Sequence, residues 1–188
     1  MHTFTAPEDG WAVTSHVVEL PSQVLVVDAQ YLLPYAREVA RGAAALGKPL
    51  TRLYVTHYHP DHLLGAGEFS APLHALPAVA DKIAAAGNRV AAEEHEKAPA
   101  LIADRARAVD ARHQRGRGNP RRRARAVSPR GRCGKQRTRL PSPSPDEGII
   151  IVQDLVYHRA HAFVGERRFD TWRAALRYHR TLRSSSMT

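Results

Sequence analysis

The stretch Thr56-His57-Tyr58-His59-Pro60-Asp61-His62 comes directly after the apolar run Leu53-Tyr54-Val55. Four of its side chains are of the kind that bind metals: His57, His59, Asp61 and His62. Imidazole nitrogens and carboxylate oxygens are suitable ligands for zinc, and also for iron or manganese. A lone histidine is usually a surface or satisfied core residue, but four such side chains packed behind a hydrophobic strand indicate a metal site.

The spacing of these side chains divides them into two pairs. His57 and His59 point to the same side of an extended or turning backbone, so they can hold one cation together. Asp61 and His62 follow Pro60, which bends the chain, so they can face a second cation beside the first. A bound metal lowers the pKa of a water molecule to about 7, and two metals about 3.5–4 Å apart also polarise the substrate. The motif therefore favours metal-dependent hydrolysis.

The sequence before and at the motif predicts a strand, a helix and a second strand. Residues 11–27 are predicted as strands, and the last of them, Val24–Val27, is a continuous apolar run that ends at Asp28. Residues Pro34–Leu46 are predicted as a helix, and Leu53–Val55 as a buried strand. This order predicts a layered α/β fold, in which ligand sites gather outside the carboxyl ends of strands.

The later sequence adds further elements of the same kinds. We expect a short strand at Pro72–Ala75 and two helices at Pro77–Ala86 and Val90–Lys97. Near the end of the chain, Ile149–Val152 has the pattern of a buried strand, and Asp170–Leu182 that of an amphipathic helix.

Between these parts the composition changes abruptly. Residues 99–145 are rich in Arg, Gly, Pro and Ser and nearly lack large aliphatic side chains. The early part, Ala100–Ala111, could continue the preceding helix. The residues from Arg112 on are predicted to be disordered. The sequence therefore predicts three parts: residues 1–98 and 146–188, which form one domain, and the segment 99–145 between them.

The net charge of +10 is located in the same segment. Residues 99–141 hold 14 Lys and Arg against 2 Asp and Glu, a net charge of +12, so the rest of the chain has a net charge of −2. A basic run such as Arg121-Arg122-Arg123 can bind phosphate backbones nonspecifically. No aromatic residues lie between its arginines to stack on bases. We therefore expect no nucleic-acid partner, and keep a basic nucleic-acid-binding or nuclease-like protein as the alternative.

Targeting signals are not visible in the sequence. Its first residues lack the basic region followed by an apolar run that is typical of a signal peptide. No apolar run approaches the roughly 18 residues that a membrane span needs. The single cysteine, Cys133, excludes an internal disulfide. These features predict a cytoplasmic protein without a membrane segment.

The motif resembles the His-x-His-x-Asp-His signature of the metallo-β-lactamase superfamily. Val24–Asp28 is similar to the strand ending in Asp that precedes the signature in this family, and Gly65-Ala66-Gly67 to the small-residue turn that follows. Gly148–Asp154 resembles the later strand whose terminal Asp bridges two metals. The resemblance covers about residues 10–98 and 146–182. It implies an αββα sandwich of four layers, incomplete here, with two metal ions, usually zinc.

The resemblance also implies roles for individual residues. His57 and His59 would bind the first metal, Asp61 and His62 the second, and Asp154 would bridge them. Asp61 would also act catalytically by orienting the attacking water, and Asp28 would hold the motif loop in place by hydrogen bonds. His158 and His161 would contribute to the substrate pocket, unless they simply alternate with their aromatic neighbours on an ordinary strand. The implied reaction is hydrolysis of an ester, thioester, amide or phosphodiester, and we expect a small-molecule substrate.

The sequence departs from the family in two histidines that relatives use as ligands. The first should lie in residues 99–145 after a glycine, but the one histidine there, His113, follows Arg112. The second should follow the helix at Asp170–Leu182, and the sequence up to Thr188 does not contain it. We interpret residues 99–145 as family sequence read in a different frame. We therefore expect an impaired enzyme with partial metal binding and exposed strand edges.

Overall fold

The computed structural model describes residues 1–112, 125–127, 137–140, 149–157, 169–170, 172–174 and 176–177. The chain divides into two compact units, Met1–Gln114 and Arg115–Thr188. In the described part of the chain, no helix combines the length and apolar character that crossing a membrane requires.

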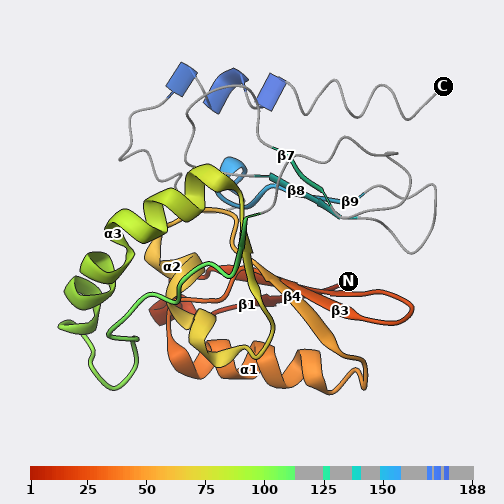
Figure 1. The fold of residues 1–188 in the computed structure, drawn as a ribbon, viewed down its shortest axis with the longest axis horizontal. Helices are drawn as coiled ribbons and strands as arrows, with labels where there is room; N and C mark the ends of the chain where they lie inside the picture. The colour runs from red at the N-terminus through yellow and green to blue at the C-terminus, as the bar shows by residue number, and fades with distance from the viewer. Residues whose placement is uncertain are drawn as a thin grey trace. The chain divides into compact units, whose positions relative to one another are not determined.

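The first unit is built on a six-stranded sheet whose strands lie in chain order (Figure 1). The strands are β1 (His2–Thr5), β2 (Thr14–Glu19), β3 (Val24–Val27), β4 (Leu50–Tyr54), β5 (Leu73–Ala75) and β6 (Ala111–Arg112). The first three strands pair antiparallel, and β3 to β6 pair parallel. Parallel neighbours need a long crossover connection, and here α1 (Leu33–Ala44) joins β3 to β4 and α3 (Pro77–His95) lies between β5 and β6.

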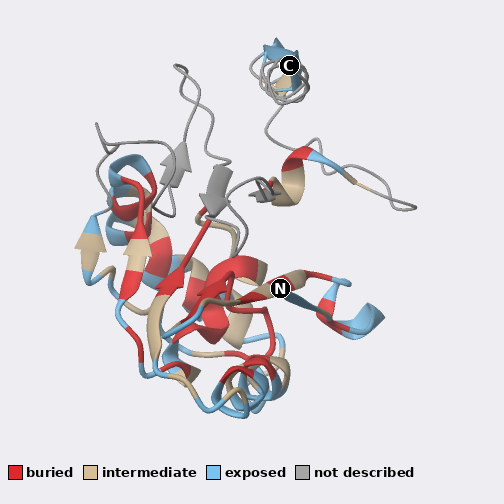
Figure 2. Cartoon of the chain, turned by 90° about the vertical axis from the view of Figure 1, so that its right-hand side faces the viewer, coloured by how far each residue is buried: buried red, intermediate tan, exposed pale blue. Residues whose placement is uncertain are grey.

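The strand β3 is the most apolar strand of the sheet. All four residues of β3 are completely buried, as the red colour at the centre of the first unit shows (Figure 2). A strand that is covered on both faces has a continuous apolar sequence rather than an alternating one. The strand prediction for Val24–Val27 is thus confirmed. The strand prediction for Trp11–Val13 is wrong, since Trp11 and Ala12 have φ angles of 58° and 51° in a turn after η1 (Glu8–Gly10).

The helix α1 packs against one face of this sheet (Figure 1). Proline suits the first turn of a helix, because a backbone N–H at this position would have no acceptor within the helix. Its buried side chains Ala36, Val39 and Ala43 share a core cluster with Val26 and Leu53 of the sheet. The helix predicted at Pro34–Leu46 is confirmed within two residues.

The helix α3 is continuous where the sequence predicts two helices. Gly87 and Asn88 lie inside it, so the predicted interruption is wrong. Gly87 is buried, and a Cβ there would lie 3.0 Å from the Cβ of Ala106. A glycine in a helix costs about 1 kcal/mol relative to alanine. The packing of α3 against Ala106 outweighs this low helix propensity of Gly87.

The residues after α3 form a non-helical connection within the first unit. The helical prediction for Ala100–Ala111 is wrong: the backbone there forms turns and extended segments. The N–H of Leu33 donates to the carbonyl of Leu101 at 2.8 Å, and Asp110 exchanges hydrogen bonds with Leu73 through its own N–H and its carboxylate. These contacts lead the chain into β6, which extends the sheet beyond β5.

The second unit contains a three-stranded antiparallel sheet of β7 (Arg125–Val127), β8 (Arg137–Leu140) and β9 (Ile149–Ile151). β9 confirms the strand predicted at Ile149–Val152 and is followed by η3 (Gln153–Leu155). The described residues between 169 and 177 are helical, which agrees with the helix predicted there. Together the units have the mixed α/β character that the sequence predicts.

Candidate metal centre

The histidine motif lies where β4 leaves the sheet. The carboxyl ends of β3 and β4 are tied together, since the N–H of Asp28 donates to the carbonyl of Tyr54 at 2.7 Å. Beyond Tyr54 the chain forms a short loop and then α2 (Pro60–Leu63), with His59 at its N-cap and proline in its first turn. The parallel strands thus place Asp28 and the motif at one edge of the sheet, as expected for a ligand site.

The carboxylate of Asp28 connects the two ends of the motif. Asp28 is completely buried. Its Oδ1 accepts a hydrogen bond from the backbone N–H of Thr56 at 2.7 Å, and its Oδ2 accepts one from the Thr56 hydroxyl at 2.8 Å. The same Oδ2 lies 2.8 Å from Nδ1 of His62. One side chain therefore fixes the residue before the first histidine and the ring of the last.

These contacts also determine which nitrogen of each ring carries the proton. An ionised carboxylate only accepts hydrogen bonds, so the Thr56 hydroxyl donates to Asp28 and the Nδ1–H of His62 does the same. The hydroxyl oxygen of Thr56 then accepts from Nδ1 of His57, which lies 3.1 Å away. In the neutral ring the other nitrogen, Nε2, keeps its lone pair. This is the arrangement of a metal-binding histidine, whose second nitrogen is held by an acceptor.

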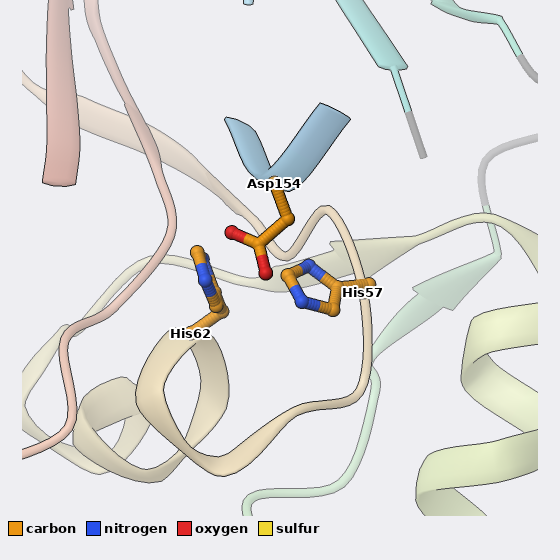
Figure 3. Close-up of side chains that lie close together, drawn as sticks. All are labelled: His57, His62 and Asp154. Carbon is orange, nitrogen blue, oxygen red and sulfur yellow. The ribbon is translucent and has the colours of Figure 1, made fainter. Parts of the chain in front are cut away.

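The three imidazoles lie close together. The ring centroid of His57 is 4.2 Å from that of His62 and 4.5 Å from that of His59. The Nε2 atoms of His57 and His62 are both buried, and Figure 3 shows the two rings side by side, one on the loop after β4 and the other on α2. His59 is half-buried.

Asp61 adds a carboxylate to this group. Its Oδ2 lies 3.2 Å from Nε2 of His62, and its side chain is 18% exposed. Two ligands at about 2.0–2.1 Å from a tetrahedral zinc ion are about 3.3 Å apart. The nitrogen and oxygen therefore have the separation that one shared cation requires, and the donor set fits a zinc-type ion.

Aromatic side chains border the motif loop. Tyr58 is half-buried next to His59, and the ammonium group of Lys82 lies 4.1 Å from the centre of its ring, a cation–π contact. Tyr31 donates a hydrogen bond to Glu94 at 2.6 Å and stacks on the exposed Trp11 at 4.3 Å. Burial, the hydrogen bond to Glu94 and the charge of Asp61 raise the pKa of the Tyr31 phenol, so it stays protonated.

The structure brings five of the predicted site residues together: Asp28, His57, His59, Asp61 and His62. A sixth, Asp154, lies on η3 of the second unit, where its carboxylate accepts a hydrogen bond from the Tyr157 hydroxyl at 3.0 Å (the side chain is drawn in Figure 3). Its bridging role stays a prediction. The remaining positions lie outside the described residues: His113, His158, His161, Cys133 and Arg121–Arg123. The substrate-pocket role of the two later histidines and the nucleic-acid alternative therefore stay predictions as well.

Two residues of the site were not assigned a role from the sequence. Thr56 orients both Asp28 and His57, and the signal available for it was a hydroxyl residue directly before the first histidine. Gly65 allows the turn after α2 to approach the loop after β3: a Cβ at this position would overlap the carbonyl oxygen of Ala29 and lie 2.5 Å from the Cβ of Ala36. The tight approach brings the N–H of Gly65 to 3.0 Å from the carbonyl of Gln30.

Comparisons with known proteins identify the family and the fold. The family model described as the metallo-beta-lactamase superfamily matches residues 9–130. No curated protein matches the chain. Among solved structures, a metallo-beta-lactamase from Pontibacter korlensis is 17% identical with a TM-score of 0.63, and the match covers 96% of this chain and 80% of that one.

Two other solved structures show the same fold at low identity. A motif variant of a metallo-beta-lactamase from Cronobacter sakazakii is 19% identical with a TM-score of 0.58, over 88% of this chain and 67% of that one. A protein named TTHA1623, in a di-iron-bound form, is 12% identical with a TM-score of 0.59, over 85% of this chain and 75% of that one. The chain is thus shorter than these relatives, and at such identities the likeness shows the fold alone.

Proposed function

The chain belongs to the metallo-beta-lactamase superfamily, and we propose that it hydrolyses a small-molecule ester, thioester or amide with zinc as its metal. Membership supports a metal-dependent hydrolase at the level of the superfamily and a divalent metal as its cofactor. The observation that carries the proposal is the anchoring of both Nδ1 atoms, of His57 on Thr56 and of His62 on Asp28. With Nδ1 held in each ring, Nε2 is the nitrogen suited to bind a cation, and the two ring centroids lie 4.2 Å apart.

The ligands of the proposed site come from two segments of the chain. His57, His59, Asp61 and His62 supply three imidazoles and a carboxylate from one short stretch after β4. We propose that Asp154 supplies a second carboxylate, because it lies on η3, the short helix that follows β9. When bound, the metal supplies Lewis acidity and makes a water molecule acidic enough to ionise near neutral pH.

The chain's own residues provide the remaining chemistry. The partly exposed carboxylate of Asp61 is suited to accept a hydrogen bond from the attacking water and so to direct its lone pair at the substrate. The exposed ring of Trp11, stacked on Tyr31, offers an apolar surface for an uncharged part of the substrate. A cytoplasmic location is part of the proposal and rests on the sequence composition.

The proposal can be tested on the full chain after reconstitution with Zn²⁺. Metal content after extensive dialysis would be measured together with hydrolysis of four chromogenic substrates: an ester, a thioester, a β-lactam amide and a phosphodiester. We expect bound zinc and turnover of one of the first three. Asp61→Asn should lower kcat by about 100-fold or more, because the oriented acceptor for the water is lost.

The matched control for metal binding is His2→Ala, since the His2 side chain is 59% exposed on β1 and lies near Glu19, away from the motif. This variant should bind zinc like the wild type, whereas His57→Ala should not. Wild-type protein without zinc after dialysis, or zinc binding that survives His57→Ala, would contradict the proposed site. Turnover of the phosphodiester alone would instead contradict the proposed substrate class.

A further inference from the structure

The loop that follows β3 is conformationally strained. Asp28 and Gln30 have φ angles of 64° and 72°, in the left-handed region that favours glycine. Both side chains are completely buried. Aspartate visits this region more readily than most residues, whereas a residue with a long side chain such as glutamine is strained there. Such strain persists only where surrounding contacts enforce it.

The contacts that enforce it come from the Gln30 amide. Its Nε2 donates to the carbonyl of Val13 at 3.2 Å and to the hydroxyl of Ser15 at 2.9 Å. The orientation of the amide is fixed, because a carbonyl oxygen such as that of Val13 can only accept. Ser15 in turn donates its hydroxyl hydrogen to the carbonyl of Asp28 at 2.7 Å. A buried chain of hydrogen bonds therefore runs from Gln30 through Ser15 to the backbone of Asp28.

The opposite side of the loop is bound to the metal motif itself. The N–H of Ala29 donates to the carbonyl of His62 at 2.9 Å, and the carbonyl of Gln30 accepts from the N–H of Gly65 at 3.0 Å. The three residues of the loop thus lie between the Ser15 contact on β2 and the helical turns that follow His59. A shift of this loop would change the position from which the Asp28 carboxylate reaches Thr56 and His62.

The Gln30 side chain also has an unmet hydrogen-bonding group. Its Oε1 is buried and accepts no hydrogen bond within the described residues. A buried acceptor without a partner lowers stability, because folding removes its hydrogen bonds to water without replacing them. Backbone strain and an unsatisfied acceptor both destabilise the fold. Their presence in one residue next to the metal ligands therefore indicates a functional role in the site.

We propose that Gln30 is a positioning residue for the metal centre: through Ser15 it holds the strained loop in the one conformation that aims the Asp28 carboxylate at His62. The proposal rests on the proposed metal site. In this role the Gln30 amide donates to Val13 and Ser15, and acts on His62 through the loop and Asp28.

The test compares three variants of the full chain with the wild type. Gln30→Met keeps the length of the side chain and removes the amide, and Ser15→Ala removes the link to Asp28. Gln30→Gly removes the amide and relieves the backbone strain at the same time. The matched control is Gln23→Met. Gln23 lies directly before β3, at the opposite end of that strand from Asp28, and its Oε1 accepts a hydrogen bond from the hydroxyl of Thr51 on β4.

Two properties would be measured. The first is the dissociation constant for Co²⁺, followed by its absorption spectrum. The second is the fraction of His62 in the Nδ1–H tautomer without metal, from the nitrogen chemical shifts of its ring. Loss of a partner behind a metal ligand typically weakens metal binding by about 10–100-fold. We expect at least about a 10-fold loss in all three variants and a lower Nδ1–H fraction, with both properties unchanged in the control.

The variant Gln30→Gly separates positioning from a purely structural role. Because glycine relieves the strain, this variant should unfold at a temperature no lower than Gln30→Met and still bind Co²⁺ weakly. Wild-type affinity in Gln30→Gly would overturn the proposal. If the wild type binds no Co²⁺, the proposed function fails, and the tautomer decides this inference by itself: an unchanged Nδ1–H fraction in Gln30→Met would overturn it, and a decrease would support it.

Discussion

Oδ2 of Asp28 lies 2.8 Å from Nδ1 of His62, although the two residues are 34 positions apart in the sequence. Both side chains are buried, with 0% and 1% exposure. The contact joins the end of β3 to α2 and fixes the ring of a proposed ligand. The stability of the loop and the orientation of the ligand therefore depend on the same hydrogen bond.

The first prediction concerns Asp28. Asp28→Asn places an NH₂ group where one of the two carboxylate oxygens accepts hydrogen bonds from Thr56 and His62. We expect metal affinity to fall by about 10–100-fold. The free energy of unfolding should fall by about 1–3 kcal/mol, because a buried donor loses its acceptor. Isothermal titration with Zn²⁺ and urea denaturation would measure the two effects.

A control for this change is Asp81→Asn. The Asp81 side chain is 63% exposed and pairs with Arg112 on the surface of the first unit. It should change neither property measurably, since exposed ion pairs contribute about 0–1 kcal/mol. Equal affinities for Asp28→Asn and the wild type would show that the carboxylate does not orient the ligand.

The second prediction concerns the two glycines after α2, in η2 (Leu64–Glu68). Gly65→Ala would drive a methyl group into the carbonyl oxygen of Ala29 and the Cβ of Ala36. We expect a loss of about 1–3 kcal/mol in the free energy of unfolding, with weaker metal binding as the motif shifts. Gly67→Ala is the matched control, because a Cβ there meets nothing within 4 Å. A stability of Gly65→Ala equal to that of Gly67→Ala would refute the close approach.

The third prediction concerns the connection between α3 and β6. The Arg107 guanidinium donates to the carbonyls of Ala66 and Phe69 at 3.2 and 2.7 Å, and to the Asp110 carboxylate at 2.9 Å. Arg107→Met should lower the free energy of unfolding by about 1–2 kcal/mol, because two carbonyls lose a charged donor. Arg105→Met, at an exposed position two residues earlier, should leave the free energy of unfolding nearly unchanged. Equal stabilities of the two variants in thermal denaturation would argue against this anchoring.

The fourth prediction concerns pH. The backbone N–H of Leu73, followed by the Arg107 guanidinium, holds the pKa of Asp110 below its ordinary value of 3.8. A folded-state pKa below the unfolded one contributes stability above the unfolded value, and that stability is lost as the pH falls through the folded one. Wild-type stability should thus decrease on acidification below about pH 4 more steeply than that of Asp110→Asn. Parallel urea midpoints of the two proteins between neutral pH and pH 3 would contradict this assignment.

The outline of the first unit could be predicted from the sequence, because its signals are local. The uninterrupted apolar run Val24–Val27 predicts a strand covered on both faces, and Pro34 predicts the first turn of the helix that follows it. The histidine spacing likewise predicts that His57, His59 and His62 converge. The composition changes abruptly at Pro99, and the first compact unit continues to Gln114.

The amino-acid sequence by itself determined that four ligand-type side chains follow a buried strand within six residues, and this pattern is sufficient to propose a metal site. Tertiary structure alone decided how these side chains are held. The Asp28–His62 and Gln30–Ser15 hydrogen bonds join residues far apart in the chain, and whether two such groups meet depends on how the parallel strands and α2 pack. The strained φ angle of Gln30 could not be predicted from the sequence either, because glutamine itself does not favour it. Only the surrounding contacts make it stable.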